Sequence, residues 1–84
     1  MKYNTLIKHI KNHKQWNTIL YIKNADNHAY MFYSLYDFEL FIKSHYQNQE
    51  RFINFEVTYI RNRKEIQIWG KTPEIYQMEK VNLC

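Results

Sequence analysis

The stretch from residue 52 to residue 70, FINFEVTYIRNRKEIQIWG, carries two runs rich in β-branched and aromatic residues around the polar pair Asn62-Arg63. Such runs on either side of a short polar turn predict an antiparallel hairpin, with strands at residues 52–61 and 64–70. Counting outward from a two-residue turn predicts which residues lie opposite each other and on which face. The apolar face pairs Tyr59 with Ile66 and Val57 with Ile68. The mixed face pairs Thr58 with Gln67 and Glu56 with Trp69. Arginine is not favoured at the second position of such a turn, so a longer loop is an alternative.

The first hairpin of the chain is predicted upstream, from strands at residues 17–23 and 29–34 that flank the turn-forming sequence NADNH, so the hairpin at residues 52–70 is the second. The first hairpin has a different pattern, because large apolar side chains fall on both of its faces. One face carries Leu20, Ile22, Met31 and Tyr33, and the other carries Ile19, Tyr21, Tyr30 and Phe32. A small monomer seldom leaves an extended apolar face in water, so both faces need a cover.

Two arrangements would cover this hairpin. In one, the first and last helices of the chain pack on one face and the second helix packs on the other. In the second arrangement, a protein partner or a second copy of the chain covers one face, since Tyr, Phe, Trp and Met are enriched at interface centres. For that arrangement we expect the partner-binding residues to be Tyr21, Tyr30, Phe32 and Trp69.

Three helices are predicted around these strands. The first spans residues 3–14, where the apolar positions follow helical spacing and lysines fall elsewhere on the wheel. Its apolar positions are Tyr3, Leu6, Ile7 and Ile10. The second is expected over residues 35–47, where Ser34 and Asp37 resemble a capping box. A short third helix is expected to begin at Thr72-Pro73-Glu74, because Thr is a good cap and Pro suits the first helical position.

The order α-β-β-α-β-β-α predicts a small α+β domain over residues 1–84, with helices on a four-stranded, mainly antiparallel sheet. With 84 residues, one glycine and one proline, the chain has room for one core, and 45% hydrophobic and 18% aromatic residues can fill it. Cys84 is the only cysteine, so no intramolecular disulfide is expected. Because no signal sequence or membrane span is visible either, a cytoplasmic location is expected.

Motifs for catalysis or metal binding are absent from the sequence. His9 and His13 are spaced to share a metal, but no HExxH or CxxC motif supplies further ligands. A chain with Gly70 as its one glycine cannot build a phosphate-cradling glycine loop. We therefore expect neither enzymatic activity, nor a metal, nor a cofactor. A metal-free ribonuclease that uses histidine beside Glu50 or Glu56 is a weaker alternative.

Basic residues gather in two places, and the chain has a net charge of +4. They are Lys8, Lys11 and Lys14 on the first helix, and Arg61, Arg63 and Lys64 at the second turn. Together with eight tyrosines, these clusters are compatible with binding of DNA or RNA through phosphate contacts and base stacking. The alternative is that both clusters are ordinary solvated surfaces.

The sequence favours a small non-enzymatic interaction protein. Its bias toward Phe, Tyr, Ile, Asn and Lys indicates an AT-rich gene, which together with the missing catalytic motifs is typical of phages and mobile elements. The expected role is inhibition or modulation of a host protein or nucleoprotein, such as a CRISPR nuclease, through an aromatic and basic surface. A basic chain cannot act by imitating DNA. The alternative is a direct DNA- or RNA-binding module.

Overall fold

The computed structural model describes residues 1–13, 15–23 and 27–71, which form two helices, four strands and two short 3-10 turns. In chain order these are α1 (Tyr3–Asn12), β1 (Thr18–Lys23), β2 (His28–Phe32), α2 (Leu35–His45), η1 (Glu50–Phe52), β3 (Asn54–Ile60), η2 (Arg61–Arg63) and β4 (Glu65–Lys71). The predicted order is therefore found as far as β4, and the predicted third helix lies outside the described residues. None of the helices described is long and apolar enough to cross a membrane.

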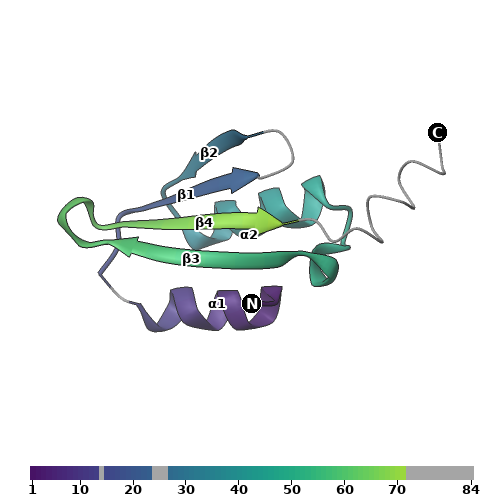
Figure 1. The fold of residues 1–84 in the computed structure, drawn as a ribbon, viewed down its shortest axis with the longest axis horizontal. Helices are drawn as coiled ribbons and strands as arrows, with labels where there is room; N and C mark the ends of the chain where they lie inside the picture. Colours follow the sequence, from purple (N-terminus) through teal and green to yellow (C-terminus); the bar gives the residue numbers. More distant parts are fainter. Residues whose placement is uncertain (14, 24–26, 72–84) are drawn as a thin grey trace.

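The four strands form one mixed sheet in the order β2-β1-β4-β3 (Figure 1). The two hairpins are antiparallel, as predicted, but β1 and β4 run parallel where the hairpins meet. The expectation of a mainly antiparallel sheet is thus only partly right. The parallel junction arises because α2 carries the chain from edge strand β2 to the opposite edge, where β3 begins and β4 then returns beside β1.

The register predicted for the second hairpin is confirmed. Its pairs include Tyr59 with Ile66, Val57 with Ile68, Thr58 with Gln67 and Glu56 with Trp69. The connection is the longer alternative, because η2 is followed by Lys64 in the left-handed conformation with φ 51°. The carbonyl of Lys64 accepts hydrogen bonds from the backbone N–H groups of Asn17, at 2.7 Å, and Thr18, at 3.4 Å. These bonds attach the loop to the start of β1.

Both described helices pack on the same face of the sheet. Tyr3 of α1 lies against Phe55 of β3, and Phe38 of α2 lies against Tyr21 of β1, with ring centroids 6.1 and 5.9 Å apart. Of the two arrangements considered for the first hairpin, the one in which the second helix packs on the opposite face from the first is therefore not found. The buried core combines both helices with one face of the sheet: Tyr3, Leu6, Ile7, Ile10, Ile19, Tyr21, Phe38, Ile42, Tyr46, Ile53, Phe55, Ile66 and Ile68.

Tyr21 lies at the centre of this core and has no exposed surface. Its ring occupies the space that a side chain at Gly70 would need, since a Cβ there would lie 2.8 Å from the Cζ atom of Tyr21. The Tyr21 hydroxyl shares a short hydrogen bond with the hydroxyl of Tyr46, which follows α2. The single glycine of the chain therefore sits where a central strand must leave room for a core aromatic ring.

Hydrogen bonds hold the chain in place at the start of each helix. Ser34 caps α2 as predicted, since its Oγ accepts a hydrogen bond of 3.1 Å from the backbone N–H of Asp37. At the other side of the core, Met1 pairs with β3: its amino group donates to the carbonyl of Phe55, and its own carbonyl accepts from the Phe55 N–H. This pairing occupies part of an edge strand that would otherwise be open.

Replacing Gly70 with Ala should lower the free energy of unfolding by about 1–3 kcal/mol, because the added methyl group overpacks the core against Tyr21. Tyr21→Phe removes the hydroxyl nearest to that methyl group, so Gly70→Ala should cost less in the Tyr21→Phe background. Urea unfolding of the four proteins of this cycle measures the coupling. Equal effects of Gly70→Ala in both backgrounds would contradict the packing described.

Candidate functional site

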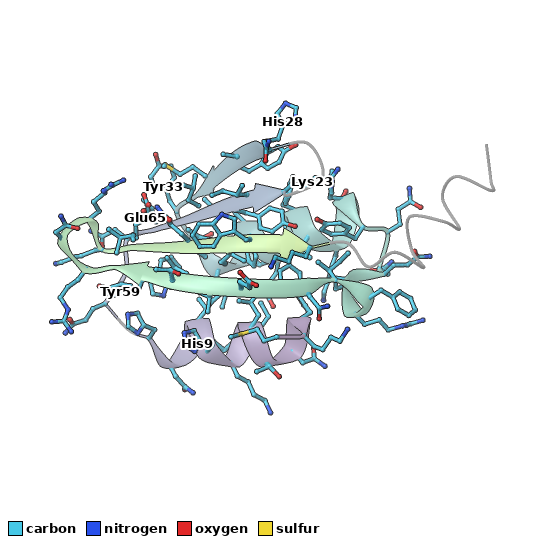
Figure 2. All side chains as sticks on the ribbon, viewed as in Figure 1. His9, Lys23, His28, Tyr33, Tyr59 and Glu65 are labelled. Atoms are coloured by element: carbon cyan, nitrogen blue, oxygen red, sulfur yellow. The ribbon has the colours of Figure 1, made fainter. Side chains whose placement is uncertain are left out.

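The face of the sheet opposite α1 and α2 is called the open face here, because no described helix covers it (Figure 2). The cross-strand register joins Leu20 to Met31 and Ile22 to Trp69 on this face. The Met31 side chain is 49% exposed, and the other three side chains are half-buried. Four large apolar side chains thus form a contiguous apolar strip across β2, β1 and β4.

Charged groups border the apolar strip, and they are paired with one another. Lys71 Nζ donates to Glu56 Oε1 over 2.6 Å, and this contact holds the pKa of Glu56 below its usual range. Glu65 accepts a hydrogen bond of 2.7 Å from Gln67 and has Arg63 at 4.0 Å. The open face therefore has an apolar centre and a polar border whose charges largely cancel.

The predicted partner-binding residues fall on two different faces. Trp69 lies on the open face, as the sequence suggested. Tyr21 is a correction, because it is fully buried and cannot touch a partner. Tyr30 and Phe32 share the Tyr21 face and pack on Phe41 of α2, with ring centroids 4.6 and 5.2 Å apart. They are half-buried under α2 rather than part of a surface with Trp69.

Sequence reasoning did not select Leu20, Ile22 and Met31, although it placed them together on one face of the first hairpin. Both faces of that hairpin are apolar, so its pattern alone cannot show which face the helices cover. The deciding signal is the pairing of β1 with β4, which puts Ile22 beside Trp69 on the mixed face of the second hairpin. A parallel register between distant strands has no local turn that would reveal it in the sequence.

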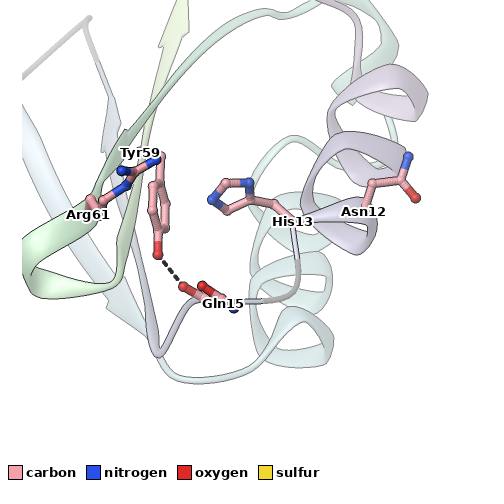
Figure 3. A pocket seen from close by; sticks show the side chains of 5 residues that line it. All are labelled: Asn12, His13, Gln15, Tyr59 and Arg61. Carbon is pink, nitrogen blue, oxygen red and sulfur yellow. Dashed lines mark hydrogen bonds between the residues drawn. The ribbon is translucent and has the colours of Figure 1, made fainter.

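A second candidate site is a hollow at the end of the sheet where β3 turns into β4 (Figure 3). It has a volume of about 560 Å³ and is lined by Asn12, His13, Gln15, Tyr59 and Arg61. Tyr59 donates a short hydrogen bond from its hydroxyl to the backbone carbonyl of Gln15. The ring of His13 lies edge-on to that of Tyr59, with centroids 4.0 Å apart. These two contacts join β3 to the segment after α1.

The fold brings the end of α1 and the loop that carries Arg61 together at this hollow. Arg61 lines the hollow beside the last residues of α1, whereas Arg63 lies near Glu65. Lys64 is exposed in the same loop. Lys8 and Lys11 are exposed on α1, and Lys14 lies outside the described residues. Of the predicted nucleic-acid contacts that the structure describes, Arg61 is the one that lines the hollow.

The histidines are spread over the fold. His9 and His13 stack with ring centroids 6.4 Å apart, whereas His45 lies against Phe41 of α2 and His28 lies on β2. Within the described ranges, no three His, Cys, Asp or Glu side chains come together in a way that could hold a metal ion. Cys84 lies outside those ranges.

Comparison of the chain with protein-family models, curated proteins and solved structures finds no match. The function is therefore argued from the chemistry of the open face and of the hollow.

Replacing Lys71 with Met should return the pKa of Glu56 toward its ordinary value, because the ammonium group that stabilises its carboxylate is lost. The lowered pKa means that this pair stabilises the fold above the unfolded-state pKa of Glu56 and that the contribution is lost as the pH falls through the folded-state pKa. NMR titration of the Glu56 carboxyl carbon in the wild type and in Lys71→Met measures the change. An unchanged titration of Glu56 would contradict the pairing.

Proposed function

We propose that this protein is a binding protein that docks a partner protein on the open face of its sheet. The observation that carries the proposal is the apolar strip of Leu20, Ile22, Met31 and Trp69, which lies opposite both described helices. Contiguous apolar surface on a small protein marks an interaction site more often than a solvated face. The partner is a protein, or the protein part of a nucleoprotein.

The residue types of the strip support a protein partner. Trp and Met are enriched at the centres of protein interfaces, where they fill pockets of the partner and are removed from water. Leu20, Ile22 and Trp69 of the strip lie on the central strands β1 and β4, whose backbones are hydrogen-bonded on both sides. A rigid scaffold therefore presents these side chains to a partner. A preorganised surface loses little conformational entropy on binding, which favours affinity.

The charges of the open face argue against nucleic acid as its ligand. Phosphate binding requires cations that are not already neutralised, whereas Lys71 is bonded to Glu56 and Arg63 lies beside Glu65. Exposed Thr58 and half-buried Gln67 add neutral polar groups next to the strip. A fitting partner therefore presents an apolar centre with neutral hydrogen-bonding groups around it. Apolar packing and hydrogen bonds need no covalent chemistry. The proposed protein therefore acts on its partner by covering or reshaping the partner's surface.

Met31→Glu should weaken partner binding at least about tenfold, because it places a charge within the apolar strip, at its most exposed residue. Leu40→Glu is the matched control, since Leu40 of α2 is 51% exposed, like Met31 at 49%, but lies away from the open face. The tagged full-length chain is used to recover the partner from the native host cell. The identified protein is then titrated against the wild type and both variants by calorimetry.

The expected result is that Leu40→Glu binds within about twofold of the wild type while Met31→Glu does not. Thermal unfolding of both variants establishes that they remain folded. Equal binding by all three proteins would overturn the proposal, as would loss of binding in Leu40→Glu alone. Sedimentation of the isolated chain supplies another test: a wild-type dimer that Met31→Glu converts to a monomer would identify a second copy, not a partner protein, as the occupant.

A further inference from the structure

The hollow beside α1 has a lining that is unusual in its charge. Its five lining residues, Asn12, His13, Gln15, Tyr59 and Arg61, all carry groups that can donate a hydrogen bond, and none is a carboxylate. Arg61 has no carboxylate partner among the described residues, in contrast to Arg63 at 4.0 Å from Glu65 and Lys71 on Glu56. The guanidinium group that borders the hollow is therefore available to an anion.

The chain that leads to the hollow adds positive charge and no negative charge. Residues 1–25 contain five lysines and no Asp or Glu, although acidic residues usually favour the first turn of a helix. On α1 the side chains of Lys8, His9 and Lys11 are exposed. These groups extend the basic surface from the hollow along about one and a half turns of α1.

The C-terminus of α1 would ordinarily repel an anion, because the last carbonyl groups of a helix are partly negative. Here the carbonyl of Ile10 accepts hydrogen bonds from the backbone N–H of His13, at 3.2 Å, and from Nε1 of Trp16, at 3.4 Å. His9 and Lys11 lie in the same last turn. The helix end is thus partly satisfied by donors and flanked by cationic or neutral side chains.

We infer that this hollow binds a phosphate group of a nucleic-acid strand. Arg61 supplies the planar guanidinium group that recognises phosphate oxygens in pairs, and the side-chain amide of Gln15 supplies a further donor. Tyr59 and His13 form the wall: the hydroxyl of Tyr59 holds the backbone at Gln15, and the His13 ring is packed against the Tyr59 ring. Their role is to position the donors.

The extent of the basic surface favours a strand over a single phosphate ion. Lys8 and Lys11 lie along α1 outside the lining of the hollow, where neighbouring phosphates of a strand would pass. In the loop, exposed Lys64 continues the charge on the other side of Arg61. A polymer with repeated phosphates uses all of these groups, whereas a free ion uses the hollow alone.

The test compares two arginines with the same charge at opposite ends of β3. Arg61 follows β3 at the hollow, whereas Arg51 precedes β3 and lies over the ring of Phe52, 4.8 Å from its centroid. Binding of fluorescently labelled single-stranded DNA and RNA to the full chain is measured by anisotropy at several salt concentrations. Arg61→Ala should weaken binding about tenfold and reduce the slope of log affinity against log salt by about 0.7. Arg51→Ala should change both by much less.

A second pair of variants changes the charge on one helix. Asn12→Asp places a carboxylate in the lining of the hollow, and Asn4→Asp places the same charge in the first turn of α1. Loss of oligonucleotide binding in Asn12→Asp but not in Asn4→Asp supports the site. Circular dichroism establishes that both variants keep their helices, because a negative charge near a helix C-terminus is itself mildly destabilising.

The inference would be overturned by a lack of oligonucleotide binding by the wild type at low salt, by equal losses in Arg61→Ala and Arg51→Ala, or by equal losses in the two Asn variants. Chemical-shift changes at the hollow with inorganic phosphate, in the absence of oligonucleotide binding, would identify a small phosphate ligand and would also overturn it. Met31→Glu should leave oligonucleotide binding unchanged, so this inference and the proposed open-face function fail or succeed separately.

Discussion

The packing of Tyr21 over Gly70 is the constraint on which the rest of this structure depends. The two residues lie on β1 and β4, the central strands, so their contact fixes how the two hairpins meet. The bond between the hydroxyls of Tyr21 and Tyr46 then ties the end of α2 to the same point. Because successive residues of a strand point to opposite faces, burial of Tyr21 leaves Leu20 and Ile22 on the open face. The apolar strip is thus a consequence of the core, because the packing that buries Tyr21 also places the strip residues of β1 on the proposed docking surface.

The same junction positions the hollow. The parallel pairing of β1 and β4 sets Thr18 beside Glu65, and the carbonyl of Lys64 accepts from the N–H groups at the start of β1. These contacts hold the β3–β4 loop next to the segment that leaves α1, so that Arg61 comes to lie beside Asn12 and His13. The end of α1 and the loop that carries Arg61 are far apart in the sequence and become neighbours because of these backbone hydrogen bonds.

The sequence predicts what depends on local patterns. The register of the second hairpin, the two described helices and the Ser34 cap follow from turn position, periodicity and side-chain chemistry, and the structure contains them. The parallel junction could not be predicted, because no short turn connects β1 to β4. Without it, the first hairpin has two equally apolar faces, and the prediction that Tyr21 binds a partner is wrong because its face is the one that the helices cover. The aromatic ring of Tyr21 suits a protein interface as well as a core. It lies in the core because Gly70 leaves the space that the ring fills. The hollow was missed for a similar reason: its lining residues come from segments that meet only in the folded chain.

The two surfaces differ in how their charges are arranged, and this difference separates their ligands. On the open face, Lys71 and Arg63 lie beside carboxylates, so a nucleic-acid strand gains little electrostatic free energy by binding there. An apolar protein surface that covers this face does not have to bury either of these cations without a partner. At the hollow, Arg61, which has no carboxylate partner among the described residues, and acid-free α1 favour phosphate and disfavour an apolar partner. Along β4 the chain advances four residues of extended strand from Glu65 to Trp69, or about 14 Å, which separates the loop end of β4 from the apolar strip on one rigid element. A nucleoprotein that presents an apolar patch and a phosphate at that spacing can engage both. The second contact is then intramolecular, so two weak contacts combine into a much tighter one without any new interaction.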